Sequence, residues 1–140
     1  FDFVGMTHAA VTAGAGVSLP ADQVSTVNST GAGAASYILP AATPGTRVHG
    51  VYIDTLATDV QIITDGVDKF TGAAMIAVND GAKKAFFPAA ANDVLSMNGT
   101  TTGGIVGSVI TVTALEAAQY LVHNTLILGS GTIVTPFSDT

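Results

Sequence analysis

GIVGSVITVTALEAAQYLVHNTLIL, residues 104–128, is the stretch that decides the fold. Val, Ile and Thr dominate most of it, and such β-branched side chains lose rotamer freedom in a helix but pack well on a pleated sheet. Its central part, Leu115 to Val122, is the best helical candidate in the chain, yet β-rich sequence flanks it on both sides. We therefore interpret this part as a bend followed by a strand, and we expect strands at 104–115 and 118–128.

Turn signals recur along the rest of the chain about every 8–12 residues, a spacing that is typical of a β-sandwich or barrel. The segments between the turns are short and apolar or alternating, and we expect strands at 21–28, 36–40, 46–54, 58–64, 73–79, 83–89 and within 92–99. We interpret 46–54 and 58–64 as a hairpin. Lys and Pro residues make 83–89 typical of a sheet edge. No linker divides the 140 residues, so we expect one all-β domain over 21–140.

The first twenty residues differ in composition, because Ala, Gly and Thr dominate and no strand or helix period is present. Such a segment cannot bury enough area to order itself alone. It is either a loose tail or an extended arm that lies on a neighbouring subunit. The apolar residues Phe1, Phe3, Val4 and Met6 favour the arm, so we predict an arm over 1–20 that makes its contacts through these four side chains.

Charged residues make up only 10% of the chain, against about 25% in an ordinary soluble domain. A surface with so little charge predicts that other subunits cover part of it, and we expect a homo-oligomer. The net charge is −6, with Arg47, Lys69, Lys83 and Lys84 as the basic residues, so we expect no nucleic-acid partner. The longest weakly charged stretch, 103–115, is shorter than the roughly 20 residues of a membrane-spanning helix, so we expect no membrane partner.

No pattern of catalytic or metal-ligating residues stands out. The chain has no Cys, which excludes disulfides and thiolate zinc sites, and no two His residues have helix-borne metal spacing. We interpret the His side chains as surface or capping groups, although a threefold oligomer can build a metal site from one His per chain; they are His8, His49 and His123. Several carboxylates lie at predicted turns, which they stabilise, although calcium can also bind such turns; they are Asp54, Asp59, Asp65, Asp68 and Asp80.

Motifs of nucleophilic catalysis and phosphate binding are also missing. The chain has no G-x-S-x-G motif, and its Gly-x-Gly fragments at 14–16, 31–33 and 129–131 do not lie between a strand and a helix. A glycosidase carboxylate pair would need a cleft that raises the pKa of one acid, whereas the acids here lie in turns, apart from the single Glu, Glu116. We therefore expect no enzyme activity, no catalytic residue, no resident metal and no cofactor.

The C-terminal run from Gly103 to Phe137 resembles the end of small capsid decoration (cement) proteins from tailed bacteriophages. The matching features are a Gly-Ser loop before a long strand, an aromatic-x-Val strand, a GSGT turn and a terminal TPF, at 107–108, 120–122, 129–132 and 135–137. Upstream turn and strand patterns of the same proteins are matched at 39–55, 60–66 and 90–99. Many of these proteins carry Trp where Tyr120 stands, and this chain has no Trp.

The resemblance implies a β-sandwich or jelly-roll-like module that forms a homotrimer on the outer surface of the capsid. It implies that the major capsid protein is the partner, that the arm contacts the capsid or a neighbouring subunit, and that Tyr120 and Phe137 contribute to the core or to trimer contacts. One alternative is another virion part, such as a tail or head-fibre base protein. Another is a carbohydrate-binding β-sandwich, which usually needs exposed aromatic side chains, whereas aromatic residues make up only 6% of this chain.

Overall fold

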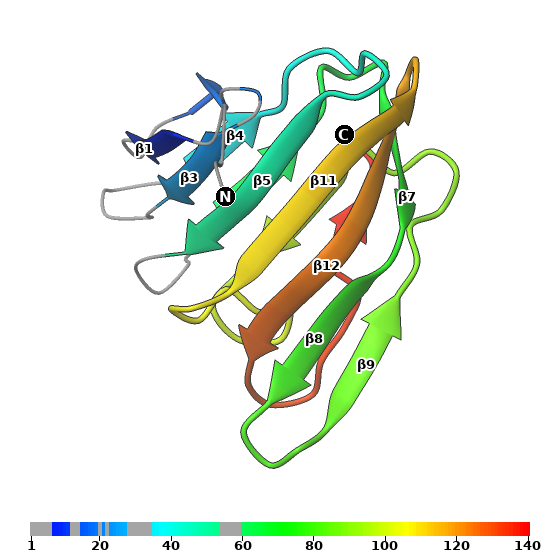
Figure 1. Cartoon of the computed structure of the whole chain (residues 1–140). Helices are drawn as coiled ribbons and strands as arrows, with labels where there is room; N and C mark the ends of the chain where they lie inside the picture. Colours follow the sequence, from blue (N-terminus) through cyan, green and yellow to red (C-terminus); the bar gives the residue numbers. More distant parts are fainter. Residues whose placement is uncertain (1–6, 12–14, 20, 22, 28–34, 54–59) are drawn as a thin grey trace.

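The computed structural model describes residues 7–11, 15–19, 21, 23–27, 35–53 and 60–140 (Figure 1). Every regular element among them is a strand, and the strands form two sheets, so the all-β prediction is confirmed. The larger sheet contains β1 (Thr7–Val11), β3 (Gln23–Val27), β5 (Arg47–Ile53), β7 (Lys69–Gly72), β8 (Ala74–Val78), β9 (Lys83–Phe86), β11 (Val109–Glu116) and β12 (Gln119–Gly129). The smaller sheet contains β2 (Val17–Ser18), β4 (Ala35–Ile38), β6 (Val60–Ile63), β10 (Val94–Met97) and β13 (Phe137–Ser138).

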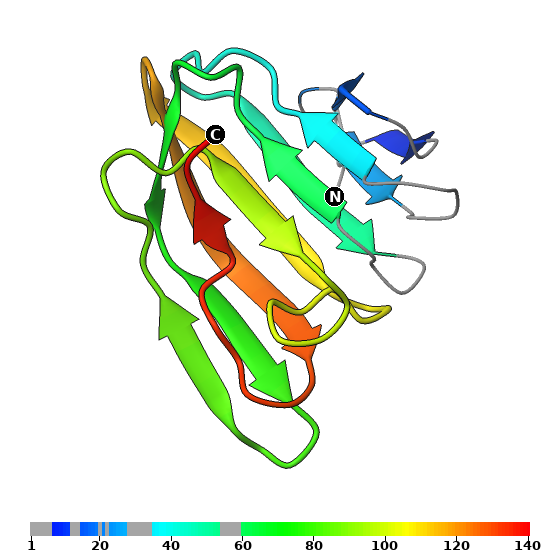
Figure 2. The same cartoon turned by 180° about the vertical axis from the view of Figure 1, so that it is seen from behind.

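Both sheets mix parallel and antiparallel pairs. The larger sheet has the order β1-β3-β5-β11-β12-β8-β9, with β7 also paired to β12, and the smaller has the order β13-β10-β6-β4-β2. Figure 2 shows the smaller sheet lying over one face of the larger. The side chains between the two sheets form one apolar core to which both contribute, for example Tyr37 and Ile62 from the smaller sheet and Ile110 and Tyr120 from the larger. Burial of each such side chain contributes about 1.5–3 kcal/mol.

A kink at Gly72 lets one long strand pair with two short ones. β12 pairs in parallel with β7 through Gln119–Val122 and with β8 through Leu126–Gly129. Gly72, the last residue of β7, has a φ of 90°, a conformation that residues with a Cβ rarely adopt. A Cβ at this position would also collide with the carbonyl oxygen of Val122. Glycine is therefore required at this point of the sheet for two separate reasons.

The bend that we predicted between the two long strands is confirmed. β11 and β12 form an antiparallel hairpin in which Glu116 pairs with Gln119, and Ala118 in its turn has a φ of 64°. The first strand begins later than expected, at Val109. Glycines in the preceding loop have positive φ values, and the Ser108 N–H donates a turn hydrogen bond to the Ile105 carbonyl, so the loop cannot continue the ladder.

The hairpin predicted from 46–54 and 58–64 is wrong. β5 lies in the larger sheet between β3 and β11, whereas β6 lies in the smaller sheet between β4 and β10. Both segments alternate as strands do, but alternation shows only that a strand has a buried face. It does not show which sheet the strand joins. The prediction that 83–89 forms a sheet edge is confirmed, because β9 is the last strand of the larger sheet.

The N-terminal segment contains two strands that we did not expect. β1 pairs in parallel with β3, and β2 pairs in parallel with β4. Leu19 is only 3% exposed within the core, and its N–H donates to the Ile38 carbonyl. Pairing with strands farther along the chain therefore supplies the order that the local sequence lacks. Phe1, Phe3, Val4 and Met6 lie outside the described residues, so the role predicted for the arm stays a prediction.

Candidate functional site

Tyr120 and Phe137 lie in the core of the single chain. Tyr120 is 0% exposed, and its hydroxyl donates a 2.7 Å hydrogen bond to the Pro40 carbonyl. Phe137 is 6% exposed and packs on Phe70, with ring centroids 6.1 Å apart. Burial, helped by the negative charges of Asp68 and Asp65, raises the pKa of Tyr120 to about 12. Both aromatic rings thus stabilise the sandwich from inside.

The turn carboxylates that the structure describes are occupied by backbone amides. Asp65 Oδ1 accepts hydrogen bonds from the N–H groups of Val67 and Asp68, each at 3.0 Å. Asp80 Oδ1 accepts one from the Ala82 N–H at 2.9 Å, and Asp68 Oδ2 accepts one from the Ala42 N–H at 2.6 Å. Asp65 and Asp80 therefore support their own turns, as predicted, whereas Asp68 binds an amide 26 residues away. The other two predicted turn acids, Asp54 and Asp59, lie outside the described residues.

Metal-ligand clusters are not found in the part of the chain that the structure describes, where no three His, Asp or Glu side chains gather. His123 lies on β12, with its Nε2 2.8 Å from the Thr113 hydroxyl on β11. The side chains of the other two histidines, His8 and His49, are not among those that the structure describes. The described residues likewise include no helix that could cross a membrane.

An ion pair with a buried carboxylate joins β7 to the residue that precedes β10 and to Thr140, and sequence reasoning missed it. Asp93 is 1% exposed and contacts the Nζ of Lys69 at 2.7 Å, while its two carboxylate oxygens accept from the N–H and the hydroxyl of Thr140 at 3.1 and 3.2 Å. Burial raises the pKa of Asp93, but the hydrogen bonds from Lys69 and Thr140 outweigh it and hold the pKa below its usual value. An ionised, fully partnered carboxylate suits a structural tie and not proton transfer.

The most distinctive surface is an apolar patch on the outer face of the larger sheet. Met75 on β8 is paired with Leu126 on β12, and these side chains are 42% and 45% exposed. Their sequence neighbours Ala74, Ile76 and Ile127 are completely buried, so Met75 and Leu126 point away from the core. We define the β8–β12 face by the apolar residues that share this side according to the register: Met75, Ala77, Ala85, Val109, Leu126 and Leu128.

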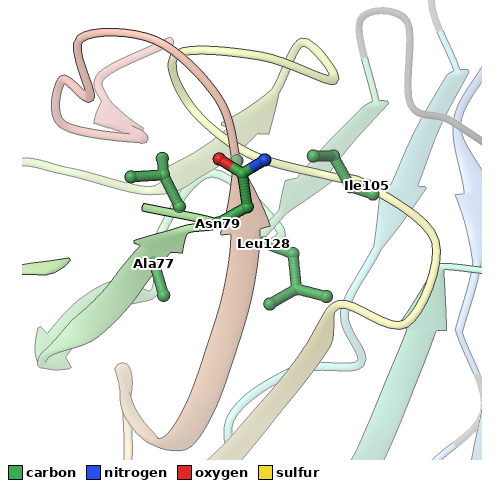
Figure 3. Close-up of a pocket in the computed structure, with 6 residues that line it drawn as sticks. Ala77, Asn79, Ile105 and Leu128 are labelled. Carbon is green, nitrogen blue, oxygen red and sulfur yellow. The ribbon is translucent and has the colours of Figure 1, made fainter. Parts of the chain in front are cut away.

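An apolar pocket of about 230 Å³ lies at one end of the β8–β12 face (Figure 3). Six residues line it: Ala77, Val78, Asn79, Ile105, Leu128 and Gly129. The N–H of Ile105 donates to the Leu128 carbonyl at 3.0 Å, which holds the loop before β11 against the end of β12. A Cβ at Gly129 would lie 2.7 Å from the Thr100 carbonyl oxygen, so glycine permits this close approach. The pocket continues the apolar surface and contains no acid or base.

Two continuous apolar runs in the sequence signal this face, although we did not predict it from them. A strand that alternates polar and apolar residues has one wet face, whereas a continuous apolar run is typical of a strand covered on both faces. AMIAV in β8 and LIL at 126–128 in β12 are such runs.

Neither a protein-family model, nor a curated protein, nor a solved structure matches this chain.

Proposed function

We propose that this protein is a capsid decoration protein of a tailed bacteriophage. In this role a homotrimer binds the outer surface of the head, contacts the major capsid protein and bridges adjacent capsomers. The observation that carries the proposal is the exposed β8–β12 face on a chain of which only 10% is charged. Large exposed apolar patches on proteins mark surfaces that bind a partner. The resemblance of the C-terminal run to decoration proteins points to the shell as that partner.

The physics of a bridge between capsomers fits such a surface. A pressurised shell opens at its joints, and a protein bound across a joint must be released before the joint can open. Each contact contributes about 25 cal/mol per Å² of buried apolar area, less the cost of ordering the partners. Three such contacts in one trimer release together only rarely, because each remaining contact keeps the detached one close to its site.

Binding to heads assembled without this protein tests the proposal. Met75 and Leu126 each keep more than two fifths of their surface exposed, so burial on docking can still contribute about 0.6–1.3 kcal/mol for each side chain. The double variant M75T/L126T should therefore bind heads about tenfold or more weakly. The matched control is V67T, since Val67 is exposed in the turn between β6 and β7 and lies outside the β8–β12 face.

The position of the protein in an electron-microscopy map of the intact particle is the second measurement. Density at threefold or quasi-threefold points of the shell is the expected result. Density on the tail or at the base of head fibres would replace the proposal with that alternative. Head binding that is equal for M75T/L126T and the native chain would show that the β8–β12 face is not the docking surface.

A further inference from the structure

The pocket at the end of the β8–β12 face has room for one apolar group. Its volume is about 230 Å³. A cavity of about 150 Å³ is enough to hold benzene, whereas pockets for drug-sized ligands span about 300–1,000 Å³. None of the lining residues is charged, and Figure 3 shows Ala77, Ile105 and Leu128 around Asn79. The pocket therefore suits a single phenyl ring or branched aliphatic side chain.

Two polar side chains lie beside this apolar space. Lys83 on β9 is directly opposite Ala77, so the two side chains share a face, with about 4.5–5.5 Å between their Cβ atoms. Lys83 is exposed, and no described residue forms an ion pair with it. The side chain of Asn79 makes no hydrogen bond to any described residue. A bound group can therefore meet an unpaired ammonium and an unpaired amide at the edge of the pocket.

The charge around the pocket favours an acidic group next to the apolar one. The β8–β9 hairpin, residues 74–86, contains Lys83, Lys84 and Asp80 and so has a formal charge of +1, while the rest of the chain carries −7 of the net −6. The Asp80 carboxylate accepts a hydrogen bond from the Ala82 N–H within the turn. Lys84 lies on the opposite face of the strand, so Lys83 is the hairpin cation on the pocket's side.

A second copy of the chain fits this pocket less well. Phe87 is 74% exposed, the largest value among the large apolar side chains that the structure describes, so it is the obvious group to insert. However, Phe87 follows Lys83 and Lys84 closely in the sequence, and an interface that used it in both copies would gather four ammonium groups. Such like charges repel one another. The occupant is therefore better supplied by another protein that places an acid beside the apolar side chain.

We propose that the pocket binds one apolar side chain of the partner that covers the β8–β12 face, and that an acidic residue of this partner pairs with Lys83. The Asn79 amide both donates and accepts hydrogen bonds, so it can bind the backbone of the inserted residue. Buried anchors of this kind contribute most of the affinity of many interfaces. This inference rests on the proposed function, because it names the contact through which the β8–β12 face holds its partner.

NMR titration of the full-length chain with phenylacetate tests the ligand chemistry, because this probe combines an apolar ring with a carboxylate. It should shift the methyl resonances of Ile105 and Leu128 far more than that of Met75, which lies on the same face outside the pocket. The neutral analogue phenylacetamide should bind about threefold more weakly. K83Q should remove this preference, whereas K84Q, which changes the net charge equally, should keep it. Equal shifts at Met75, or an unchanged preference in K83Q, would overturn the proposal.

Filling the pocket provides a second measurement. A77L should weaken the binding of phenylacetate, and of heads assembled without this protein, about tenfold. A85L is the matched control, because Ala85 lies on the same face but does not line the pocket. Circular dichroism checks that both variants keep the native strand content, and K83Q provides the result if A77L does not fold.

The head-binding results separate this inference from the proposed function. If A77L binds heads as tightly as A85L while M75T/L126T binds weakly, the face docks without an anchor and the inference is wrong. If the native chain does not bind heads, the proposed function fails, and the phenylacetate titration still decides which ligand the pocket takes. Probe binding that weakens as the protein concentration rises, and recovers in F87A, would show a second copy in the pocket and overturn the inference.

Discussion

A comparison of Gly72→Ala with Gly66→Ala should separate two costs of replacing a glycine, namely the cost of a positive φ and the cost of a steric clash. Gly72 has a φ of 90°, and a Cβ there would collide with the carbonyl oxygen of Val122 and lie 2.7 Å from the Leu121 Cδ1. Gly66 has nearly the same φ, 89°, but no atom lies within 4 Å of its Cβ position. G66A therefore carries the conformational cost alone, whereas G72A adds a steric clash.

The magnitudes follow from these two environments. A residue with a Cβ at positive φ costs about 1–2 kcal/mol, which both variants share. At Gly72 the colliding atom belongs to the backbone, so relief requires β7 to move away from β12. That movement adds about 1–3 kcal/mol of overpacking strain and weakens the hydrogen bond from the Ala73 N–H to Val122, worth about 1 kcal/mol. We expect G72A to lose about 3–5 kcal/mol and G66A about 1–2 kcal/mol of unfolding free energy.

Equilibrium urea unfolding at one fixed protein concentration measures both values, because the midpoint shifts with stability while the slope reports the surface exposed. An unchanged slope with a much lower midpoint for G72A is the expected result. If the two variants lose the same unfolding free energy within about 0.5 kcal/mol, the close approach of β7 to β12 at Gly72 adds no cost of its own, and the steric argument for Gly72 is wrong.

Four further outcomes are expected. The pKa of Asp93 is lower in the folded chain than in the unfolded chain, so its ionised carboxylate stabilises the fold above about pH 4, and this stabilisation disappears as the pH falls through the folded pKa. The melting temperature should therefore fall more steeply in acid for the native chain than for D93N. The pKa of Tyr120 is raised to about 12, so its stabilising contribution is present below about pH 10 and is lost between pH 10 and 12. Ultraviolet titration should show a late-ionising tyrosine signal that is lost in Y120F. Sedimentation at micromolar concentration should show a trimer, and a clean monomer would contradict the prediction from low charge. Chelator should leave the melting temperature unchanged, whereas a large drop would revive the calcium and threefold-histidine hypotheses.

Local sequence determined the strands and many of the turns. Alternation and β-branched residues placed strands where β4, β6, β8 and β10 lie, and Lys and Pro identified the edge at β9. The same local logic identified the Asp residues that bind the amides of their own turns. These features depend on side chains a few residues apart, so a short window of sequence contains the information that specifies them.

Tertiary structure alone decided which strands became neighbours. It separated β5 from β6, recruited β1 and β2 from a segment without any period, and placed Lys69 beside Asp93. It also brought Met75 and Leu126 together as one exposed apolar face. The physical reason is that periodicity reports which side chains of a strand share a face, whereas pairing depends on contacts between residues distant in sequence, whose free energy appears only when the whole core is assembled.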